Sequence, residues 1–434
     1  MRESRYNTWI DDGPTTYVHN GFSGRVVPMP AAQREPTRRF IAGDDSVTVD
    51  PALISVLVDA RVVVADRTDE LELLRDRYEQ TRRNPGRFHL TIVPSLGCDL
   101  DCLYCFEAKH PSLLDEEVQQ RLLRLVEQKL PAVRSFAVLW YGGEPLVGLP
   151  ALLRLSDEFI TRCAAAGVSY QAEIITNGHL LTTETARLLR ARHVTAAQVT
   201  MDGPAEVHDR RRPLAGGRGT FDQLLANVVA VAGILDVTVR VNLDTDNVGD
   251  AARLLEILAA AGLAGRVGVY PGHVVATTAN PLAPSARYGT ACLSKAAFAE
   301  AEQHFAEAAA GLGFATVALP EPVGAPCTAV RDNELVIGSR GEIYKCTETV
   351  GDPKEVIGNL RSWPQPDDRL SKWLTYDPFG DDDCRSCVAL PGCMGGCAYH
   401  AMTSASRDTR CSTFRFRQEQ QVRRMVAGRR GRVS

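Results

Sequence analysis

Three cysteines in one short stretch of this chain offer metal-binding chemistry. Cys98, Cys102 and Cys105 follow the spacing Cys-x3-Cys-x2-Cys. A cube of four irons and four sulfides normally takes four thiolates, one on each iron. Three thiolates on one loop would therefore leave one iron open to a substrate or cofactor. This spacing is also compatible with a zinc knuckle, which usually has four ligands, and with unligated thiols.

Seven further cysteines lie in the C-terminal part of the chain, and they include the tight spacing Cys-x2-Cys-x5-Cys-x3-Cys. The tight group alone would suggest two zinc knuckles, but seven thiolates fit neither one four-thiolate site nor two. Together with the first three, they account for ten of the 12 cysteines. This uneven distribution indicates metal binding in a reducing cytosol rather than disulfide bonds. The seven are Cys327, Cys346, Cys384, Cys387, Cys393, Cys397 and Cys411.

Composition and charge exclude several classes of protein. The chain has 434 residues, of which 44% are hydrophobic and 24% charged, and its net charge is −4. These values are typical of a soluble protein with two or three domains and no bulk attraction to nucleic acid. No apolar run approaches the roughly 20 residues of a membrane span, and residues 1–6 do not resemble the start of a signal peptide. We therefore expect a cytoplasmic protein with neither nucleic-acid nor membrane partners.

Strands and helices alternate between residues 88 and 275, which predicts an α/β fold. The six expected strands are apolar enough to be buried on both faces, as parallel strands are. Six such strands fit an open, partial (β/α)6 barrel of the TIM type, whose chemistry lies at the carboxyl ends of the strands. The cysteine loop follows the first of them. The expected strands cover residues 88–94, 136–140, 171–176, 197–200, 237–243 and 267–270.

Three more strand ends carry candidate residues. The loop Gly142-Gly143-Glu144-Pro145 follows the second strand. Its glycines permit close backbone approach, its carbonyls can accept hydrogen bonds from an ammonium group, and Glu144 can support that contact. A plain Gly-Pro turn would show the same residues. Asn177 and Thr200 end the third and fourth strands, where a polar residue is otherwise a cap or turn former.

The cysteine loop resembles the cluster-binding loop of the radical S-adenosylmethionine (SAM) enzymes. In that family the three cysteines hold a 4Fe–4S cluster, and the fourth iron binds the amino and carboxylate groups of SAM. Electron transfer then cleaves SAM and gives a 5'-deoxyadenosyl radical, which abstracts a hydrogen atom. The resemblance implies that Cys98, Cys102 and Cys105 bind the catalytic cluster. It also places Phe106, next to Cys105, near the adenine of SAM.

The resemblance extends to further SAM contacts. The loop Gly142–Pro145 resembles the GGEP motif, whose edge binds the SAM amino group in the family. In similar enzymes, the strand ends that correspond to Asn177 and Thr200 touch the ribose and methionine parts of SAM.

A run from Asp202 to Phe221 resembles the Asp-Gly-Pro … His-Asp … Arg … Gly-Thr-Phe run of peptide- and protein-modifying members. This makes Arg212 our candidate for a charge-assisted contact to the SAM carboxylate. We interpret its neighbours Arg210 and Arg211 as solvated or peptide-facing.

The seven C-terminal cysteines resemble the SPASM extension of radical SAM enzymes at all seven positions. In that family they hold two auxiliary 4Fe–4S clusters in an interleaved way, so the resemblance implies three clusters in all. By position, the first auxiliary cluster takes Cys327, Cys346 and Cys397. The second takes Cys384, Cys387, Cys393 and Cys411.

The first auxiliary cluster would be one thiolate short, and two cysteines remain. Cys163 lies in an apolar helix and is most simply a packed small residue. Cys292 could be the fourth ligand, a hydrogen donor to a product radical, or a bystander. Our expectation is an open iron that can accept a substrate thiolate.

The resemblance covers about residues 88–411 and suggests four domains. We expect a small α+β module over residues 1–85, a radical SAM partial barrel over 86–315, a SPASM domain over 316–415, and a basic C-terminal tail over 416–434. The N-terminal module could dock a peptide by strand addition to an exposed sheet edge, or it could brace the barrel.

Enzymes of this architecture commonly modify peptides. We therefore expect a maturase that forms a thioether or carbon–carbon crosslink in a ribosomally made precursor peptide, with a reductant such as flavodoxin or ferredoxin. Sulfatase-maturing members have an acidic residue directly after the cysteine that corresponds to Cys346. Here Thr347 takes that position and Glu348 comes next, which disfavours oxidation of Cys or Ser in a sulfatase.

Two further readings are compatible with these patterns. A small-molecule dehydrogenase could share the same architecture. A non-catalytic iron–sulfur or zinc scaffold for electron transfer could use the same cysteines, but the loop Gly142–Pro145 argues against it, because a scaffold needs no SAM site.

Overall fold

The chain folds into two compact units. The barrel unit comprises Asn84–Val317 and Thr328–Thr375, and the terminal unit comprises Met1–Arg83, Ala318–Cys327 and Tyr376–Ser434. The computed structural model describes residues 1–275, 283–316, 321–362, 368–404 and 407–430.

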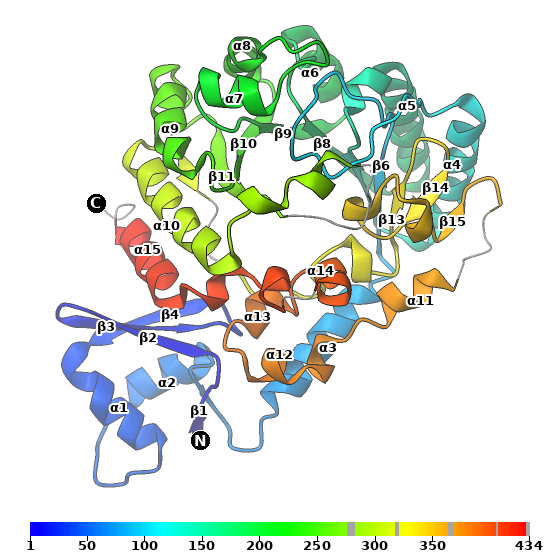
Figure 1. Cartoon of the computed structure of the whole chain (residues 1–434). Coiled ribbons are helices and arrows are strands. Elements are labelled where there is room, and N and C mark those ends of the chain that lie inside the picture. Colours follow the sequence, from blue (N-terminus) through cyan, green and yellow to red (C-terminus); the bar gives the residue numbers. More distant parts are fainter. Residues whose placement is uncertain (276–282, 317–320, 363–367, 405–406, 431–434) are drawn as a thin grey trace. The chain divides into compact units, whose positions relative to one another are not determined.

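The barrel unit is built on a ten-stranded sheet with the strand order β12-β11-β10-β9-β8-β7-β6-β13-β14-β15. From β6 to β11 every strand is parallel to the next one in the sequence. The predicted α/β fold with a mainly parallel sheet is thereby confirmed (Figure 1). The bounds are Arg87–Ile92 (β6), Ser135–Trp140 (β7), Ser169–Thr176 (β8), Val194–Thr200 (β9), Asp236–Leu243 (β10) and Gly268–His273 (β11).

Helices connect the parallel strands and lie around the outside of the sheet (Figure 1). Local capping defines where they begin: the Asp115 side chain accepts a hydrogen bond from the Val118 N–H, and the Thr182 side chain accepts one from the Thr185 N–H. Each cap satisfies a backbone donor that the first helical turn leaves free. The helices are Glu116–Lys129 (α4), Leu149–Ala166 (α5), Thr183–Arg190 (α6), Ala205–Arg211 (α7), Phe221–Val231 (α8), Ala251–Ala260 (α9) and Lys295–Gly311 (α10).

Four short strands extend this sheet at its two edges. At one edge, β13 pairs in parallel with β6 and turns at Gly341 (φ 83°) into the antiparallel β14. Val336 and Tyr344 of this hairpin pack against Val93 and Leu96, which follow β6. The residues after β14 are thus carried to the side of the sheet where the cysteine loop begins. The bounds are Ala315–Thr316 (β12), Glu334–Ile337 (β13), Glu342–Tyr344 (β14) and Gly358–Asn359 (β15).

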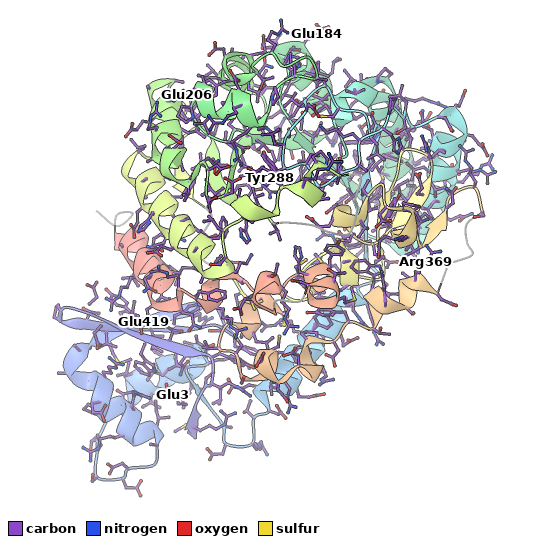
Figure 2. All side chains as sticks on the ribbon, viewed as in Figure 1. Glu3, Glu184, Glu206, Tyr288, Arg369 and Glu419 are labelled. Carbon is purple, nitrogen blue, oxygen red and sulfur yellow. The ribbon has the colours of Figure 1, made fainter. Side chains whose placement is uncertain are left out.

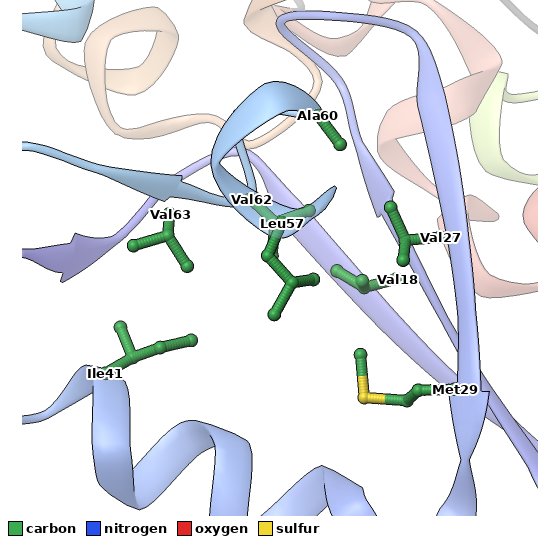
Figure 3. Packing of buried hydrophobic residues seen from close by; sticks show 8 residues of the cluster. All are labelled: Val18, Val27, Met29, Ile41, Leu57, Ala60, Val62 and Val63. Carbon is green, nitrogen blue, oxygen red and sulfur yellow. The ribbon is translucent and has the colours of Figure 1, made fainter. Parts of the chain in front are cut away.

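The terminal unit contains a small three-stranded antiparallel sheet in the order β2-β3-β4. Side chains from β3, β4 and the following helices form one apolar core, which includes Val18, Met29 and Leu57 (Figure 3). Two further strands, β1 and β5, pair with each other. The bounds are Arg2–Glu3 (β1), Asn7–Asp12 (β2), Thr15–Asn20 (β3), Arg25–Pro30 (β4), Val63–Val64 (β5), Arg34–Ile41 (α1), Pro51–Asp59 (α2) and Glu70–Arg82 (α3).

The predicted C-terminal tail is wrong for most of its length. Residues Gln418–Arg430 form a helix, α15, that contacts β2. Val422 and Val426, four residues apart, are buried with Ile10 in a second apolar cluster. This helical spacing gives one apolar stripe, which the many arginines of the segment concealed. Residues 431–434 lie outside the described part. Among the described residues, no helix is long and apolar enough to cross a membrane.

Candidate active site

The three cysteines of the first loop all interact electrostatically with one lysine. Lys109 lies in the same loop and donates to the Leu100 carbonyl. Its burial would lower the pKa of the ammonium group, but Cys105, Cys102 and Cys98 outweigh this and raise it. All three thiols are therefore electrostatic neighbours of one cation. A cluster held by three thiolates carries negative charge, which such a cation would offset.

Burial raises the pKa of Cys98 and of Cys105 to about 12. Both thiols are therefore protonated in the metal-free chain at neutral pH. Iron binding must displace those protons, because the thiolate is the form that binds metal.

The glycine loop packs directly on the cysteine loop. The Gly143 N–H donates to the Ser95 carbonyl (3.2 Å), and the Glu144 N–H donates to the Gly97 carbonyl (2.9 Å). A Cβ at residue 143 would lie 2.6 Å from the Leu96 carbonyl oxygen, closer than side chains approach. Gly142 has φ 129°, which favours glycine. The two glycines thus allow a backbone contact that no larger residue would permit.

Glu144 stabilises this contact through hydrogen bonds. Its side chain is fully buried and accepts hydrogen bonds from the Leu146 N–H (3.0 Å), the Thr176 hydroxyl (2.7 Å) and the Asn177 N–H (2.7 Å). These bonds join the end of β7 to the end of β8. The structure therefore gives Glu144 a positioning role, and its direct contact with SAM stays a prediction.

Asn177 reaches the cysteine loop from the end of β8. Its side-chain amide donates to Asp99 Oδ1 (2.6 Å) and lies 3.7 Å from the Cys98 sulfur. Thr200 ends β9 and is paired with Arg240 of β10. Phe106 is half-buried beside Cys105. The SAM contacts expected for these residues stay predictions.

Arg212 is buried next to the cluster loop. Its Nη1 donates to the Tyr104 hydroxyl (2.7 Å), and its Nε is buried with no hydrogen-bond partner among the described residues. Burial would lower the pKa of Arg212, but Cys102, Tyr104 and Asp202 raise it well above its usual value. A buried, charged donor without a partner is costly, so this Nε fits an anionic ligand beside Cys102. That arrangement agrees with the expected contact to a carboxylate.

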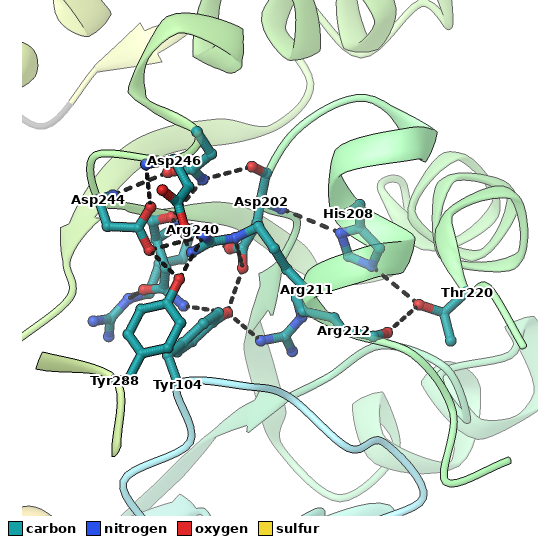
Figure 4. Close-up of polar contacts among 12 residues, drawn as sticks. Tyr104, Asp202, His208, Arg211, Arg212, Thr220, Arg240, Asp244, Asp246 and Tyr288 are labelled. Atoms are coloured by element: carbon teal, nitrogen blue, oxygen red, sulfur yellow. Dashed lines mark hydrogen bonds and ion pairs between the residues drawn. The ribbon is translucent and has the colours of Figure 1, made fainter. Parts of the chain in front are cut away.

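Tyr104, inside the cysteine loop, is a functional residue that the sequence interpretation missed. Its hydroxyl donates to Asp202 and accepts from Arg212 and from the Asn242 side chain (3.1 Å), as Figure 4 shows for the first two. The Tyr104 hydroxyl thus connects the cysteine loop to the ends of β9 and β10. Its position between two cluster cysteines was the available signal.

Arg211 is neither solvated nor peptide-facing, so this expectation is wrong. Its side chain is 3% exposed and forms ion pairs with Asp244 (2.8 Å) and Asp202 (3.4 Å) (Figure 4). It also donates to the Tyr288 hydroxyl (3.0 Å). The two carboxylates come from loops after different strands, which local sequence does not reveal. Arg210, in contrast, is exposed.

The segment 283–293 crosses this end of the barrel unit and is tied down at three points. The Ser285 N–H donates to the Cys105 carbonyl (2.9 Å), the Tyr288 hydroxyl donates to Asp244 (2.7 Å), and the Ala291 carbonyl accepts from Thr245 (2.8 Å). In Figure 2, Tyr288 lies toward the centre of the unit, whereas Glu184 and Glu206 lie on its helical outside. The segment is therefore fixed against both the cysteine loop and the loop after β10.

Glu107, directly after the loop, is a second residue that the sequence interpretation missed. The side chain is 3% exposed, and burial raises its pKa to about 8, although the Tyr141 hydroxyl that donates to it opposes this shift. The folded chain therefore holds a proton that the unfolded chain releases near the ordinary value of 4.5.

This proton makes stability depend on pH in a defined direction. Between about pH 4.5 and pH 8 the folded state binds more protons, so stability falls as pH rises, by on the order of 3–5 kcal/mol. The amide of the Glu107→Gln variant carries no titrating proton, so this variant does not lose stability in this way as the pH rises. We expect its melting temperature, relative to the wild type, to rise by several degrees from about pH 5 to pH 8. If the melting temperatures of the two proteins changed in parallel with pH, the conclusion that Glu107 is buried and protonated would be wrong.

Four of the seven C-terminal cysteines come together within the terminal unit. Burial raises the pKa of Cys384 to about 11, and Cys393 and Cys411 add to the shift. Burial also raises the pKa of Cys393, and the charges of Cys411 and Cys387 add to that rise. The four thiols are therefore electrostatic neighbours. Arg415 Nη1 donates to the Cys411 sulfur (3.2 Å) and would offset cluster charge. This is the set expected for the second auxiliary cluster.

Three consecutive residues at the end of a short helix shape this group. Met394, Gly395 and Gly396 all have positive φ (43°, 82° and 69°), which reverses the chain between Cys393 and Cys397. A Cβ at residue 396 would collide with the Arg410 carbonyl. The Cys397 N–H donates to that carbonyl (3.0 Å).

The cysteines expected for the first auxiliary cluster are divided between the units. Cys327 and Cys397 belong to the terminal unit, and Cys346 belongs to the barrel unit, so their grouping stays a prediction. Cys292 belongs to the barrel unit and is half-exposed, whereas Cys163 is buried within α5 as expected. Among the described residues, no three His, Cys, Asp or Glu side chains converge on one metal ion. Such convergence is expected for the ligands of a single metal ion, whereas thiolates that bind separate irons of a cube lie farther apart.

The comparison with family models decides the class of this site. Residues 92–265 match the model of the Radical SAM superfamily. The chain contains a radical SAM domain. A domain of this family implies SAM and a 4Fe–4S cluster, and the three thiols around Lys109, the glycine contact and the unpartnered Arg212 Nε fit both.

Curated relatives match the radical SAM part of the chain. The serine-type anaerobic sulfatase-maturating enzyme of Klebsiella aerogenes is 27% identical over 151 residues, which is 34% of this chain and 37% of the relative. The chain thus spans little more than a third of the length of such relatives.

Two solved structures share the fold over a longer range. The structure of anSMEcpe with bound AdoMet and Cp18Cys peptide has a TM-score of 0.59 and 17% identity, and the match covers 79% of this chain and 99% of anSMEcpe. Streptococcus suis SuiB bound to its precursor peptide SuiA has a TM-score of 0.53 and 14% identity, and the match covers 95% of this chain and 99% of SuiB.

Proposed function

We propose that this enzyme is a radical SAM maturase that abstracts a hydrogen atom from a residue of a ribosomally made precursor peptide and forms a thioether or carbon–carbon crosslink. The observation that carries the proposal is the close backbone contact of the glycine loop with the cysteine loop, whose three thiols all act electrostatically on Lys109. Two proteins of the same fold have peptides bound, which supports a peptide as substrate.

When bound, SAM and the cluster supply the hydrogen-abstracting radical, and the protein's own residues position the reactants. Cys98, Cys102 and Cys105 would hold the cluster. Arg212, held by Tyr104, would bind the SAM carboxylate, and the carbonyls of the glycine loop would accept from its ammonium group. The segment 283–293 would keep water from the reacting atoms.

The four thiols of the terminal unit support a second auxiliary cluster, with Cys384, Cys387, Cys393 and Cys411 as ligands. We further propose that Cys327, Cys346 and Cys397 hold the first auxiliary cluster and leave one iron open to a substrate thiolate, with Cys292 as the alternative fourth ligand. Such an open iron would suit thioether formation.

Three four-iron clusters imply about 12 irons per chain in protein reconstituted without oxygen. Iron and acid-labile sulfide analyses check this number. A protein that binds zinc and no sulfide under anaerobic conditions would contradict all three assignments.

The N-terminal module is our candidate for peptide docking by strand addition. In its sheet, β2 and β4 are the edge strands. Pro28 and Pro30 lie in β4, where each removes a backbone donor and so blocks pairing. Edge strand β2 contains no proline. We therefore place the peptide along β2, where it would compete with Arg423 of α15 for the Asp11 carbonyl (2.6 Å). A reductant such as flavodoxin or ferredoxin completes the expected partners.

A sulfatase-maturing activity is the second candidate, and the placement of Glu348 favours it. Although Thr347 follows Cys346, the carboxyl of Glu348 is an electrostatic neighbour of Tyr141 and Arg240 in the barrel unit. An acid is therefore available close to the expected position, which weakens the sequence argument against this activity.

Mass spectrometry of candidate peptides separates the two activities. Short peptides encoded beside this gene, and sulfatase peptides with a Cys or Ser, are each co-expressed with the protein. A crosslink removes two hydrogen atoms and joins two residues, so fragment ions between them disappear. Oxidation of Cys or Ser leaves every backbone fragment intact and creates an aldehyde that hydrazide reagents label. A labelled sulfatase peptide and unchanged neighbouring peptides would overturn the crosslinking proposal.

A further inference from the structure

Leu103 is a large apolar side chain that lies exposed in the cysteine loop. It is 48% exposed, and it directly follows Cys102, which is buried. A single apolar side chain at the surface is common and by itself needs no explanation. Leu103 is distinguished by its place, because it lies one residue from a thiol that is expected to bind the catalytic cluster.

Three backbone hydrogen bonds fix the exposed part of this loop against the segment that begins at the end of α7. They join residues 99–103 to residues 211–215. The bonds run from the Leu103 N–H to the Arg211 carbonyl (3.2 Å), from the Asp101 N–H to the Pro213 carbonyl (2.7 Å) and from the Ala215 N–H to the Asp99 carbonyl (2.8 Å). The position of Leu103 therefore depends on its backbone and leaves its side chain available to a partner.

Two exposed arginines lie on either side of these hydrogen bonds. Arg210 directly precedes Arg211 in α7, and the Arg218 carbonyl accepts from the Leu214 N–H (2.9 Å). The side chains of Arg210 and Arg218 are exposed, and within the described part of the chain neither forms an ion pair or a side-chain hydrogen bond. Both positive charges are therefore free to interact with another molecule.

The carboxylates of the same region already have partners. Asp99 Oδ2 lies 2.7 Å from His179 Nδ1, and Asp101 pairs with Lys109 (3.7 Å). Asp209 accepts hydrogen bonds from two backbone N–H groups at the start of α8. The surface thus offers one apolar side chain with two unpaired cations beside it, and this combination fits a partner of negative charge.

The catalytic cluster of a radical SAM domain has to receive an electron from outside the protein. The carrier must come close to the cluster, because electron transfer between proteins becomes slower steeply with distance. Such encounters use small contact areas, in which an apolar centre with a charged rim is the common arrangement. The whole chain has a net charge of −4, so an acidic carrier needs a local positive surface to steer its approach.

We propose that Leu103, Arg210 and Arg218 form the docking surface for a small acidic electron-carrier protein that reduces the catalytic cluster. This inference rests on the proposed function, because it takes the cysteine loop to hold that cluster and a protein to be the reductant. Only an electron moves in this step: the carrier is oxidised by one electron, the cluster is reduced by one, and no covalent bond forms or breaks.

The test measures docking and cluster reduction separately from SAM cleavage. The probe is flavodoxin, an acidic protein with one flavin, and the full chain is reconstituted with iron and sulfide. Thermophoresis of labelled flavodoxin gives the Kd, and stopped-flow absorbance follows cluster reduction by flavodoxin that carries fully reduced flavin. We expect binding and reduction both to weaken about tenfold when salt rises from about 0.02 M to about 0.3 M, because added ions screen the arginines.

Two variants separate the contributions of charge and apolar contact. Arg210→Glu combined with Arg218→Glu should raise the Kd about tenfold and slow reduction by flavodoxin to the same extent. Leu103→Gln keeps every charge and should weaken binding about threefold, since apolar contact area is lost. With dithionite, a small reductant that needs no docking, both variants should form 5'-deoxyadenosine at a rate within twofold of the wild type.

The matched control is Arg190→Glu. Arg190 is exposed and ends α6, just before β9 begins at Val194, so it lies at the opposite end of the sheet from the cysteine loop. Its replacement makes the same change of charge and should alter neither the Kd nor the rate of cluster reduction.

The outcomes distinguish this inference from the proposed function. A double arginine variant within twofold of wild type in Kd and reduction rate, or an equal effect of Arg190→Glu, would overturn the docking surface. A parallel loss of 5'-deoxyadenosine with dithionite would overturn it too, because the substitutions would then act on the cluster itself. If Leu103→Gln assembles no cluster, the double arginine variant decides. A wild type that forms no 5'-deoxyadenosine with dithionite removes the proposed function, whereas formation with no variant effect removes only the docking surface.

Discussion

Replacing Cys98, Cys102 and Cys105 together by alanine is expected to abolish reductive cleavage of SAM. These thiols are the only expected protein ligands of the catalytic cluster, and all three act electrostatically on Lys109. Without them no iron would be available to bind SAM. The C-terminal cysteines are untouched, so about two thirds of the iron should remain. The measurement is 5'-deoxyadenosine formed with dithionite, together with iron per chain.

Cys163→Ala is the matched control for this experiment. It removes a buried thiol from α5 that lies in none of the expected cluster groups. We expect wild-type iron content and SAM cleavage from this variant. Continued 5'-deoxyadenosine formation by the triple variant would refute the assignment of the catalytic cluster, whereas complete loss of iron would show that the C-terminal clusters depend on the first loop.

Replacing Arg212 by alanine should weaken SAM binding about tenfold to a hundredfold. The buried guanidinium has an Nε with no hydrogen-bond partner in the described part of the chain, and Cys102 is its electrostatic neighbour. A hydrogen bond from a charged group contributes about 1.5–3 kcal/mol. Tyr104→Phe should give a smaller loss, because the Tyr104 hydroxyl positions Arg212 (2.7 Å) and does not replace it. Equilibrium dialysis with labelled SAM measures both affinities.

Arg210→Ala supplies the control for charge. Arg210 lies two residues away and is exposed, so its removal lowers the local positive charge without opening the buried site. An Arg212→Ala protein with wild-type SAM affinity, or equal losses for both variants, would mean that Arg212 has no specific contact with SAM.

The positions of the parallel strands along the chain and the loops of the site could be predicted because both depend on local sequence patterns. Six apolar runs alternate with helices, and β6 to β11 follow these runs with small shifts of their ends. The loop Gly142–Pro145 was identified by its two glycines, and the structure gives the reason in the close contact with the Leu96 carbonyl. Here the chemistry demands particular residues next to one another in the sequence.

The polar network of the site could not be predicted from such patterns. Tyr104 lies in the cysteine loop, and Asp202 and Asn242 lie at the ends of two different strands, so only the folded barrel unit brings the three together. Arg211 seemed solvated because its neighbours are charged, yet Asp244 lies 2.8 Å away.

The two edges of the sheet escaped prediction for a related reason. Strand β13 adds to β6 across more than two hundred residues of chain, and this pairing brings the hairpin that precedes Glu348 to the edge of the barrel sheet. Nothing near Glu334 or Leu335 in the sequence specifies that partner.

The most direct test of the account is the electron paramagnetic resonance spectrum of the reduced protein before and after addition of SAM. If Cys98, Cys102 and Cys105 hold a cluster with one open iron, SAM must bind that iron and change one part of the spectrum. The wild type should show this change and then form 5'-deoxyadenosine, while the triple cysteine variant shows neither. A wild-type spectrum that SAM leaves unchanged, with no 5'-deoxyadenosine formed, would contradict the account.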